Sequence, residues 1–226
     1  MDKLFHQMQA MKLDRLQSAI RASPHLLHTR DWLGRTLLFG SGSIFEGKSV
    51  ERMAFLIDQG LDLDDQENRD RKTVLHQACS RHDSGVVDLL LTRGANITLT
   101  DRNGCTPLMI ASKFSKDVIL DLLLQHGGND LNAVNNEGRT ALHLSAIECY
   151  DKVVTLLITA GADPTIQDNI GMTPLAHAQR YAEMHLKRWR NDMNDFLSST
   201  YHRQFARLAE YLQVGPLFSL LGMLVR

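Results

Sequence analysis

The chain has 226 residues, 43% of them hydrophobic, 23% charged and 6% aromatic, so it can bury a substantial core. Its formal net charge of −1 removes any overall electrostatic attraction to nucleic acid or anionic membranes. No stretch approaches the roughly 18 apolar residues of a membrane span, and the first residues lack the basic start and apolar run of a signal peptide. We therefore expect an intracellular, cytoplasmic protein with no transmembrane segment.

Two short helices are predicted at the start of the chain. Apolar residues recur at helical spacing from Leu4 to Met11 and again from Leu13 to Ile20, and Pro24 ends the second helix. We predict that residues 1–30 form an N-terminal helical cap.

A phrase of the form Asp/Asn-x-x-Gly-x-Thr-x-Leu then recurs with little variation. Its threonines are separated by 37, 33, 34 and 33 residues and are Thr36, Thr73, Thr106, Thr140 and Thr173. A second phrase, an aliphatic run that ends in glycine, keeps step with the first. Recurrence at this period indicates a repeat architecture.

Physical roles follow for the repeated positions. A threonine before proline, as in Thr106-Pro107, is typical of a helix N-cap and first turn. The aliphatic run gives a second helix a broad apolar face. The glycines fit the left-handed position that ends this helix, and they are Gly60, Gly94, Gly127 and Gly161. Each unit is thus predicted to be helix, turn, helix and projecting loop, with a tight turn at each first phrase.

These units resemble the ankyrin repeat, whose D-x-x-G-x-T-P-L-H-x-A signature is matched from about residue 31 to residue 180. The resemblance implies an all-α fold, a solenoid of stacked helix-turn-helix units with projecting loops, here with five repeats over residues 31–190. It also implies that His76 and His143 form hydrogen bonds within their repeats, to Thr73 and Thr140. The sequence departs from the family where Arg71 replaces the turn glycine and where other residues replace the histidine, namely Phe39, Met109 and Ala176.

The last part of the chain is predicted to form a C-terminal helical cap over residues 191–226. Apolar residues from Leu175 to Phe196 predict one helix of about twenty residues, and a further helix is expected from about Tyr201 to Leu212. The apolar tail 217–225 either packs back onto this cap or docks on a partner or a membrane surface.

The segment Gly42–Ser49 fits the phosphate-loop pattern G-x-x-x-x-G-K-[ST]. A phosphate loop needs backbone amides at the mouth of a buried parallel sheet, which a helical solenoid lacks. We therefore favour a lengthened loop between helices and keep nucleotide binding as an alternative.

No set of residues predicts catalysis, a metal site or a cofactor. The three cysteines include no C-x-x-C pair, so they indicate neither a disulfide framework nor a zinc cluster. Cys79 follows His76 by one helical turn, but no third ligand or orienting acid accompanies them. We expect no enzymatic activity.

The resemblance implies that function lies on one concave face, formed by the loop tips and the exposed side of the first helices. The residues predicted to bind a protein partner there are Trp32, Leu33, Arg35, Arg69, Lys72, Arg81, Arg102, Lys113, Phe114, Arg139, Ile147, Arg180 and Tyr181. The same face includes Asp70, Asn103, Asn136, Glu137, Glu148 and Ile170.

Eight of these residues are basic and three are acidic, so this predicted face is basic although the whole chain is nearly neutral. Basic and aromatic side chains together favour a partner with an acidic surface and apolar protrusions, with Trp32 as the best single anchor. The competing interpretation is that these charges only solvate the repeat tips. We predict a non-enzymatic protein-protein interaction module, with a dedicated inhibitor or regulatory subunit of one enzyme as the alternative.

Overall fold

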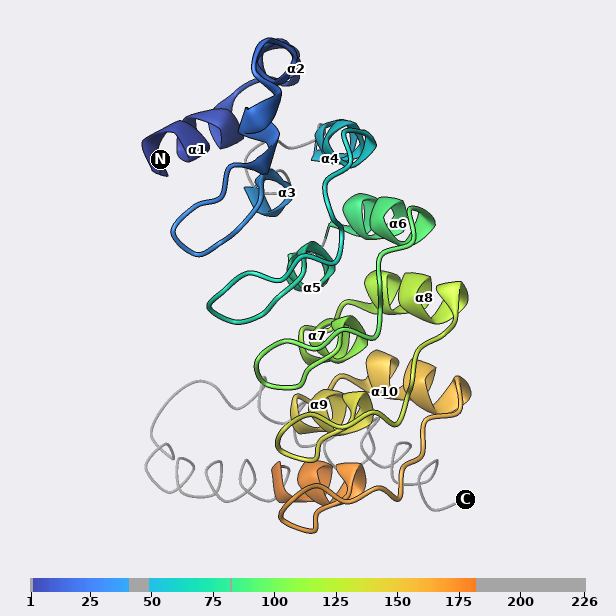
Figure 1. Cartoon of the computed structure of the whole chain (residues 1–226). Helices are drawn as coiled ribbons and strands as arrows, with labels where there is room; N and C mark the ends of the chain where they lie inside the picture. Colours follow the sequence, from blue (N-terminus) through green and yellow to red (C-terminus); the bar gives the residue numbers. More distant parts are fainter. Residues whose placement is uncertain (1, 41–48, 82, 182–226) are drawn as a thin grey trace, which may run out of the picture. The chain divides into compact units, whose positions relative to one another are not determined.

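The computed structural model describes residues 2–40, 49–81 and 83–181, and these residues contain helices, turns and loops without a β-strand (Figure 1). The chain divides into two compact units, residues 1–130 and residues 131–226.

The first unit contains an N-terminal group of helices and three helix pairs. The N-terminal group is α1 (Asp2–Ala10), α2 (Leu13–Ala22) and the 3-10 helix η1 (Pro24–His28). The pairs are α3 (Leu37–Gly40) with α4 (Ser49–Asp58), α5 (Val74–Ser80) with α6 (Ser84–Thr92), and α7 (Pro107–Lys113) with α8 (Asp117–His126).

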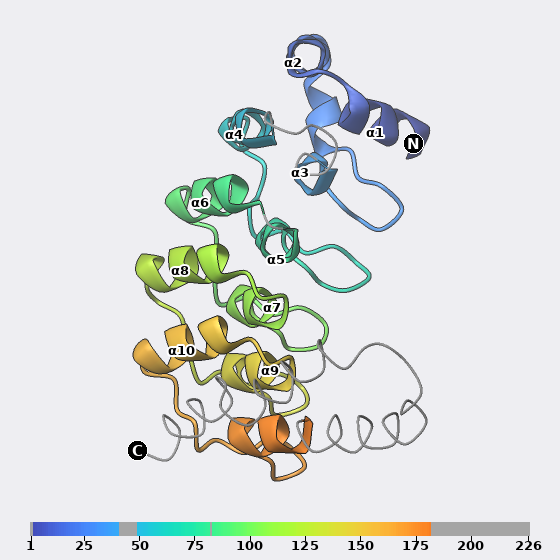
Figure 2. The same cartoon turned by 180° about the vertical axis from the view of Figure 1, so that it is seen from behind.

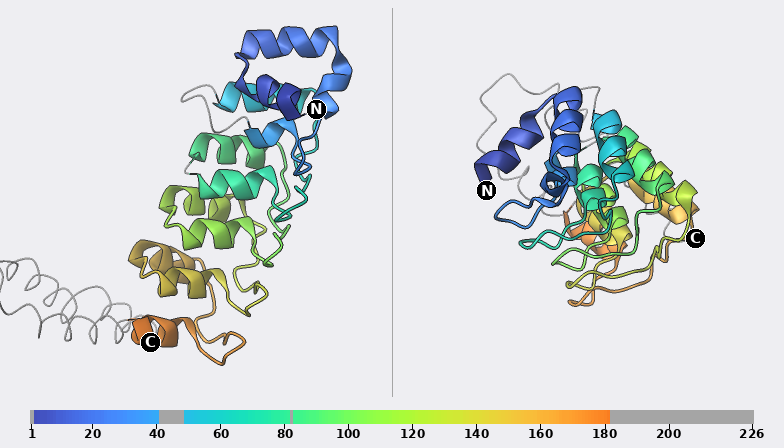
Figure 3. Two further views of the ribbon diagram at one scale, coloured as in Figure 1. Left: turned by 90° about the vertical axis from the view of Figure 1, so that its left-hand side faces the viewer. Right: turned by 45° about the horizontal axis from the view of Figure 1, so that its top comes forward.

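Within this unit α3, α5 and α7 follow one another in one row, and α4, α6 and α8 form a second row behind it (Figures 1 and 2). The hairpin loops that precede the first helices of this unit project to the same side (Figure 3). The second unit has the pair α9 (Ala141–Ile147) and α10 (Asp151–Thr159), followed by a helix that the structure describes over residues 174–181.

The repeated threonines begin the first helices as predicted. The hydroxyls of Thr73, Thr106 and Thr140 accept hydrogen bonds from the backbone N–H three residues later, which satisfies one of the free donors of each helix start. Thr36 differs, because its buried hydroxyl has no hydrogen-bond partner within the described residues. In that repeat the helix begins without a side-chain cap.

The two histidines complete a reciprocal cap. The Thr140 N–H donates to Nδ1 of His143 over 3.1 Å, so Nε2 carries the ring proton and donates to Met172 O at 3.0 Å. His76 makes the same two contacts, with Thr73 and with Cys105 O. The predicted hydrogen bonds within the repeats are confirmed, and each histidine also joins its repeat to the next turn. Phe39, which stands at the histidine position of the first repeat, has no ring nitrogen and cannot form these hydrogen bonds.

The tight turns share one backbone conformation, with a positive φ at the glycine position. Gly104 has φ +75°, and Arg71 adopts φ +54° although it carries a side chain. The turn before Thr73 therefore keeps the positive φ of the others at the cost of a left-handed residue with a side chain. Ser115 and Cys149, in the turns between the helices of their repeats, also have positive φ.

One turn is longer than its sequence suggests. In the other turns Oδ1 of the Asp or Asn accepts backbone N–H groups, as Asp101 does from Asn103 and Cys105. In the second repeat the phrase puts Asn68 at the place of Asp101, five residues before the threonine, but Glu67 takes this role and accepts from the N–H groups of Arg69 and Asp70. The extra residue is accommodated because a glutamate reaches one methylene farther than an aspartate.

The core lies between the two rows of helices. The aliphatic run of α6 places Val86, Val87 and Leu90 at 0 or 1% exposure, and the small Ala78 and Ala111 of the first helices are also buried. Small residues let the helices approach closely, and the aliphatic runs fill the space behind them. The glycines after the second helices have the predicted positive φ, from +77° at Gly127 to +100° at Gly161.

The N-terminal helices are anchored by an arginine that the sequence did not single out. Arg52 of α4 is buried, and its guanidinium donates to Met8 O at 2.7 Å and to Met11 O at 2.6 Å. These carbonyls lie at the C-terminal end of α1, where a cation is favourable. Burial lowers the pKa of Arg52.

Several predictions lie outside the described residues. They are the phosphate-loop-like segment from Gly42 to Lys48, the continuation of the last helix from residue 182, the helix expected near Tyr201 to Leu212 and the tail 217–225.

Candidate protein-binding surface

Backbone hydrogen bonds hold the hairpin tips of each unit in a row. In the first unit the Asn68 N–H donates to Leu33 O at 2.8 Å, and the Arg102 N–H donates to Asp70 O at 2.7 Å. In the second unit the Asn169 N–H donates to Glu137 O at 3.0 Å. Side chains on neighbouring tips of one unit are thus presented at fixed spacing.

Most of the predicted binding residues of the first unit are accessible. Trp32 at a hairpin tip is 68% exposed and Phe114 at the end of α7 is 44% exposed. Arg69, Arg81, Arg102 and Lys113 are exposed, whereas Leu33, Arg35 and Lys72 are partly buried.

Some of the predicted basic residues are paired with acids on the same surface. Arg35 donates from Nε to Oδ2 of Asp31 at 2.6 Å, and Asp31 is fully buried in its side chain. Lys72 lies 3.5 Å from Asp70. The charge of Arg35 is therefore largely compensated within its own turn, which the sequence count of basic residues did not reveal.

Other basic residues have no such compensation. Among the described residues no carboxylate lies within ion-pair distance of Arg69, Arg81 or Lys113. Burial and the nearby charge of Arg35 both lower the pKa of Arg81. An excess of positive charge thus remains along the hairpin tips and first helices of the first unit.

The second unit carries a denser polar network. Arg139 pairs with Glu137, and its Nε lies 3.6 Å from Oδ2 of Asp168. Asp168 also accepts from Nε2 of His177 at 2.6 Å, and its carboxyl is almost fully buried. Burial raises the pKa of Asp168, but the hydrogen bonds from His177 and from the Met172 and Ile170 N–H groups outweigh it and hold the pKa at about 2.

The other predicted residues of the second unit are less involved in this network. Arg180 is exposed and its guanidinium contacts the Met172 sulfur at 3.7 Å. Tyr181 is 36% exposed, and Ile147 is partly buried. Ile170, at a hairpin tip, is 64% exposed.

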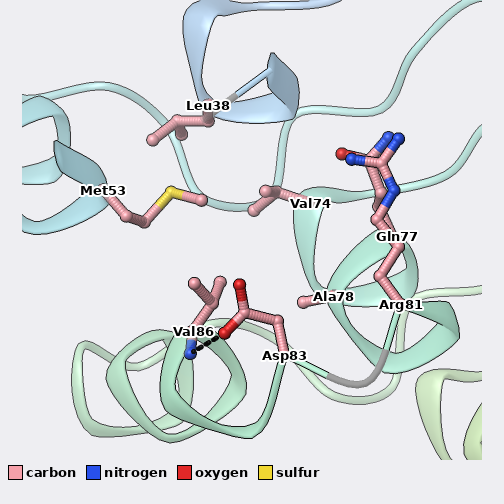
Figure 4. A pocket seen from close by; sticks show the side chains of 8 residues that line it. All are labelled: Leu38, Met53, Val74, Gln77, Ala78, Arg81, Asp83 and Val86. Carbon is pink, nitrogen blue, oxygen red and sulfur yellow. Dashed lines mark hydrogen bonds between the residues drawn. The ribbon is translucent and has the colours of Figure 1, made fainter. Parts of the chain in front are cut away.

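A small hollow opens between the first two helix pairs of the first unit (Figure 4). Apolar side chains including Leu38, Met53 and Val74 line it together with the polar side chains of Gln77 and Arg81. It has room for about one water molecule, so it is no site for a nucleotide or metabolite. Gln77 is not among the predicted binding residues, although its four-residue distance from Arg81 could have placed it on the same helix face.

The described residues give little support for a metal site or a catalytic nucleophile. No group of three or more His, Cys, Asp or Glu side chains that could hold a metal ion occurs among them. Cys79 is fully buried, and this burial raises the pKa of its thiol far above the ordinary range, which keeps it a poor nucleophile. Nδ1 of His76 points at Thr73 rather than at this thiol.

The family model for ankyrin repeats, in three copies, matches residues 75–168 and 122–187, which together cover half of the chain. The chain belongs to the ankyrin repeat family. The fold is accordingly an all-α ankyrin-repeat solenoid. Ankyrin repeats are protein-protein interaction modules, and the coarse function follows from this membership.

Three relatives illustrate the range of proteins that contain similar ankyrin repeats. An ankyrin repeat protein of fowlpox virus is 37% identical over 114 residues, which are 50% of this chain and 33% of the relative. Human B-cell lymphoma 3 protein is 37% identical over 134 residues, 58% of this chain and 30% of the relative. Neurogenic locus notch homolog protein 1 of mouse is 32% identical over 152 residues, 66% of this chain and 6% of the relative.

The chain thus spans a third or less of each of these relatives. The similarity extends over the repeats and does not transfer the relatives' individual roles. Among the described residues no helix is both long and apolar enough to cross a bilayer.

Proposed function

We propose that this protein binds a partner protein through the hairpin tips and first helices of its ankyrin repeats, and that the partner presents an acidic surface with apolar protrusions. The observation that carries the proposal is the group of accessible cations without carboxylate partners in the described structure, Arg69, Arg81 and Lys113, next to the exposed rings of Trp32 and Phe114. Arginine and aromatic side chains together are frequent interface anchors.

The proposed mechanism is mass action without catalysis. A partner surface that is occupied by the repeats is recruited or masked, and masking of an enzyme would make this chain its inhibitor or regulatory subunit. We place this activity in the cytoplasm, since Cys79, Cys105 and Cys149 form no disulfide within the described residues, as is typical of a reducing compartment.

The proposal includes the division of the chain into three parts, with residues 1–30 and 191–226 as end caps of the repeats in 31–190. A solenoid needs such caps because an open end would expose an apolar face. Docking through the tail 217–225 stays a prediction from the sequence.

The test is a charge reversal of the uncompensated cations. We expect the triple variant Arg69→Glu, Arg81→Glu and Lys113→Glu to lose the partner that the wild-type chain captures from its native cell, as measured by quantitative mass spectrometry. The matched control reverses Lys3, Arg15 and Arg21, three exposed basic residues of α1 and α2, and changes net charge equally. Equal capture by both variants, with unchanged circular dichroism, would refute the basic-surface proposal.

A further inference from the structure

We propose that the first helices of the first unit bind a partner segment that carries a carboxylate and an aromatic or aliphatic side chain. The distance between these two groups matches the separation of neighbouring repeats, so that the carboxylate binds Arg81 and the apolar group packs on Phe114. This inference rests on the proposed function and specifies the chemistry of its partner.

Arg81 and Phe114 occupy equivalent places in neighbouring repeats. Each is the C-cap residue of its first helix, α5 or α7, and each follows the capping threonine by eight residues. The two helices pack directly against one another, as Figures 1 and 2 show. Packed helix axes lie about 8–10 Å apart, so the two side chains start from the surface at about this separation.

Arg81 has the properties of an anchor for a carboxylate. Its side chain is exposed and lines the hollow in Figure 4, as does that of Gln77. The nearby Arg35 is already bonded to Asp31, while no carboxylate of the described residues pairs with Arg81. A guanidinium without such a partner can hold an incoming carboxylate with two hydrogen bonds.

Phe114 supplies the apolar half of the surface. Its ring is 44% exposed at the end of α7, and the preceding Lys113 is exposed and has no ion pair with a described residue. An incoming aromatic or aliphatic side chain would cover the ring and remove apolar area from water. The lysine adds attraction for the same acidic segment.

The separation restricts the spacing of the two side chains in the partner. In a polyproline II segment, residues three apart lie on one side and are separated by about 9 Å. In an α-helix, residues seven apart lie on one side and are separated by about 10 Å. We therefore expect a spacing of three residues in an extended partner or seven in a helical one.

The experiment is a selection of random peptides, long enough to span three repeats and displayed on phage, against the immobilised full-length chain. We expect enrichment of an Asp or Glu at one of these two spacings from an aromatic or aliphatic residue. For the selected peptide, Arg81→Ala and Phe114→Ala should each weaken binding about tenfold. The matched controls Arg93→Ala on the loop after α6 and Val118→Ala on α8, which is 59% exposed, should not.

A charge exchange makes the test specific. Arg81→Glu should abolish binding of the selected peptide, and replacing the peptide's carboxylate by lysine should restore it. No enriched peptide, other spacings, or equal affinity of the four alanine variants would each overturn the inference. A native partner that the triple reversal loses, but that binds the Arg81→Ala and Phe114→Ala variants fully, would overturn it while leaving the proposed function intact.

Discussion

The turn around Arg35 in the first unit and the turn around Arg139 in the second place the same residue type directly before the repeated threonine, yet form different ion pairs. In both turns Oδ1 of the Asx residue accepts the backbone N–H groups, from Arg35 to Asp31 and from Arg139 to Asn135. Arg35 also binds the second oxygen of Asp31, whereas Asn135 has an amide nitrogen there and Arg139 turns to Glu137 and Asp168. Arg35 thus pairs with the Asx residue of its own turn, whereas Arg139 pairs with Glu137 of its own turn and also reaches Asp168 of the next repeat.

The same two repeats differ in their helix caps. Thr140 and His143 form the reciprocal cap that continues to Met172 O, while Thr36 has Phe39 at the corresponding position and its hydroxyl is unsatisfied within the described structure. The first repeat shows that the helix can begin without the histidine.

His143→Phe gives the fourth repeat the residue of the first. It leaves a buried Thr140 N–H and Met172 O without their partner, so we expect a loss of about 3 kcal/mol in the free energy of unfolding, measured by urea denaturation. His126→Phe, at an exposed site at the end of α8, is the control. A loss below about 1 kcal/mol would show that the cap is of minor importance.

Asp31→Asn gives the first repeat the turn residue of the fourth. The backbone contacts of Oδ1 are kept, but Arg35 loses its charged acceptor, so we expect a loss of about 1 to 2 kcal/mol. The reciprocal Asn135→Asp offers Arg139 a carboxylate in its own turn and should change stability by less than about 0.5 kcal/mol. Equal effects of the two variants would mean that the ion pair does not depend on the Asx residue.

Acid should weaken the capped repeats. Burial is the main cause that lowers the pKa of His76 and His143, although their hydrogen bonds to Cys105 O and Met172 O act against it. The unfolded chain therefore binds protons first, and stability should fall as pH drops below about 6.5. Urea denaturation between about pH 8 and pH 5 tests this, and His143→Phe should show a shallower decline. A stability that rises on acidification would contradict it.

Arg71→Gly should stabilise the second repeat slightly. The positive φ of Arg71 is strained for a residue with a side chain and free for glycine, so we expect a gain of about 0.5 to 1 kcal/mol in the free energy of unfolding. Arg69→Gly, in the same hairpin, serves as the control because Arg69 has no positive φ, and it should be neutral or destabilising. A loss of stability in Arg71→Gly would mean that its contact with Gln66 outweighs the strain.

The repeated residues predicted the fold because their roles are local. Thr106 before Pro107 fixes a helix start, and Gly94 fixes a helix end, from a few neighbouring residues. The length of the second hairpin was less predictable, since Glu67 and Asn68 could each accept the turn's N–H groups and only the three-dimensional path distinguishes them.

The location of the candidate surface could be predicted from the sequence better than its net charge. Trp32 and Phe114 are exposed where the repeat pattern puts them. The compensation of Arg35 by Asp31 and of Arg139 by Glu137 and Asp168 depends on side-chain directions that no spacing rule supplies. Whether these residues bind a partner stays a prediction.

Arg52 has a consequence for anyone who trims or fuses this protein. Removing α1 would leave the Arg52 guanidinium buried without the carbonyls of Met8 and Met11, which now accept its hydrogen bonds. The damage would then start inside α4, far from the cut in sequence. A shortened version should therefore carry an apolar residue such as leucine at position 52. Amide hydrogen exchange in α4 would report whether this substitution keeps the helix closed.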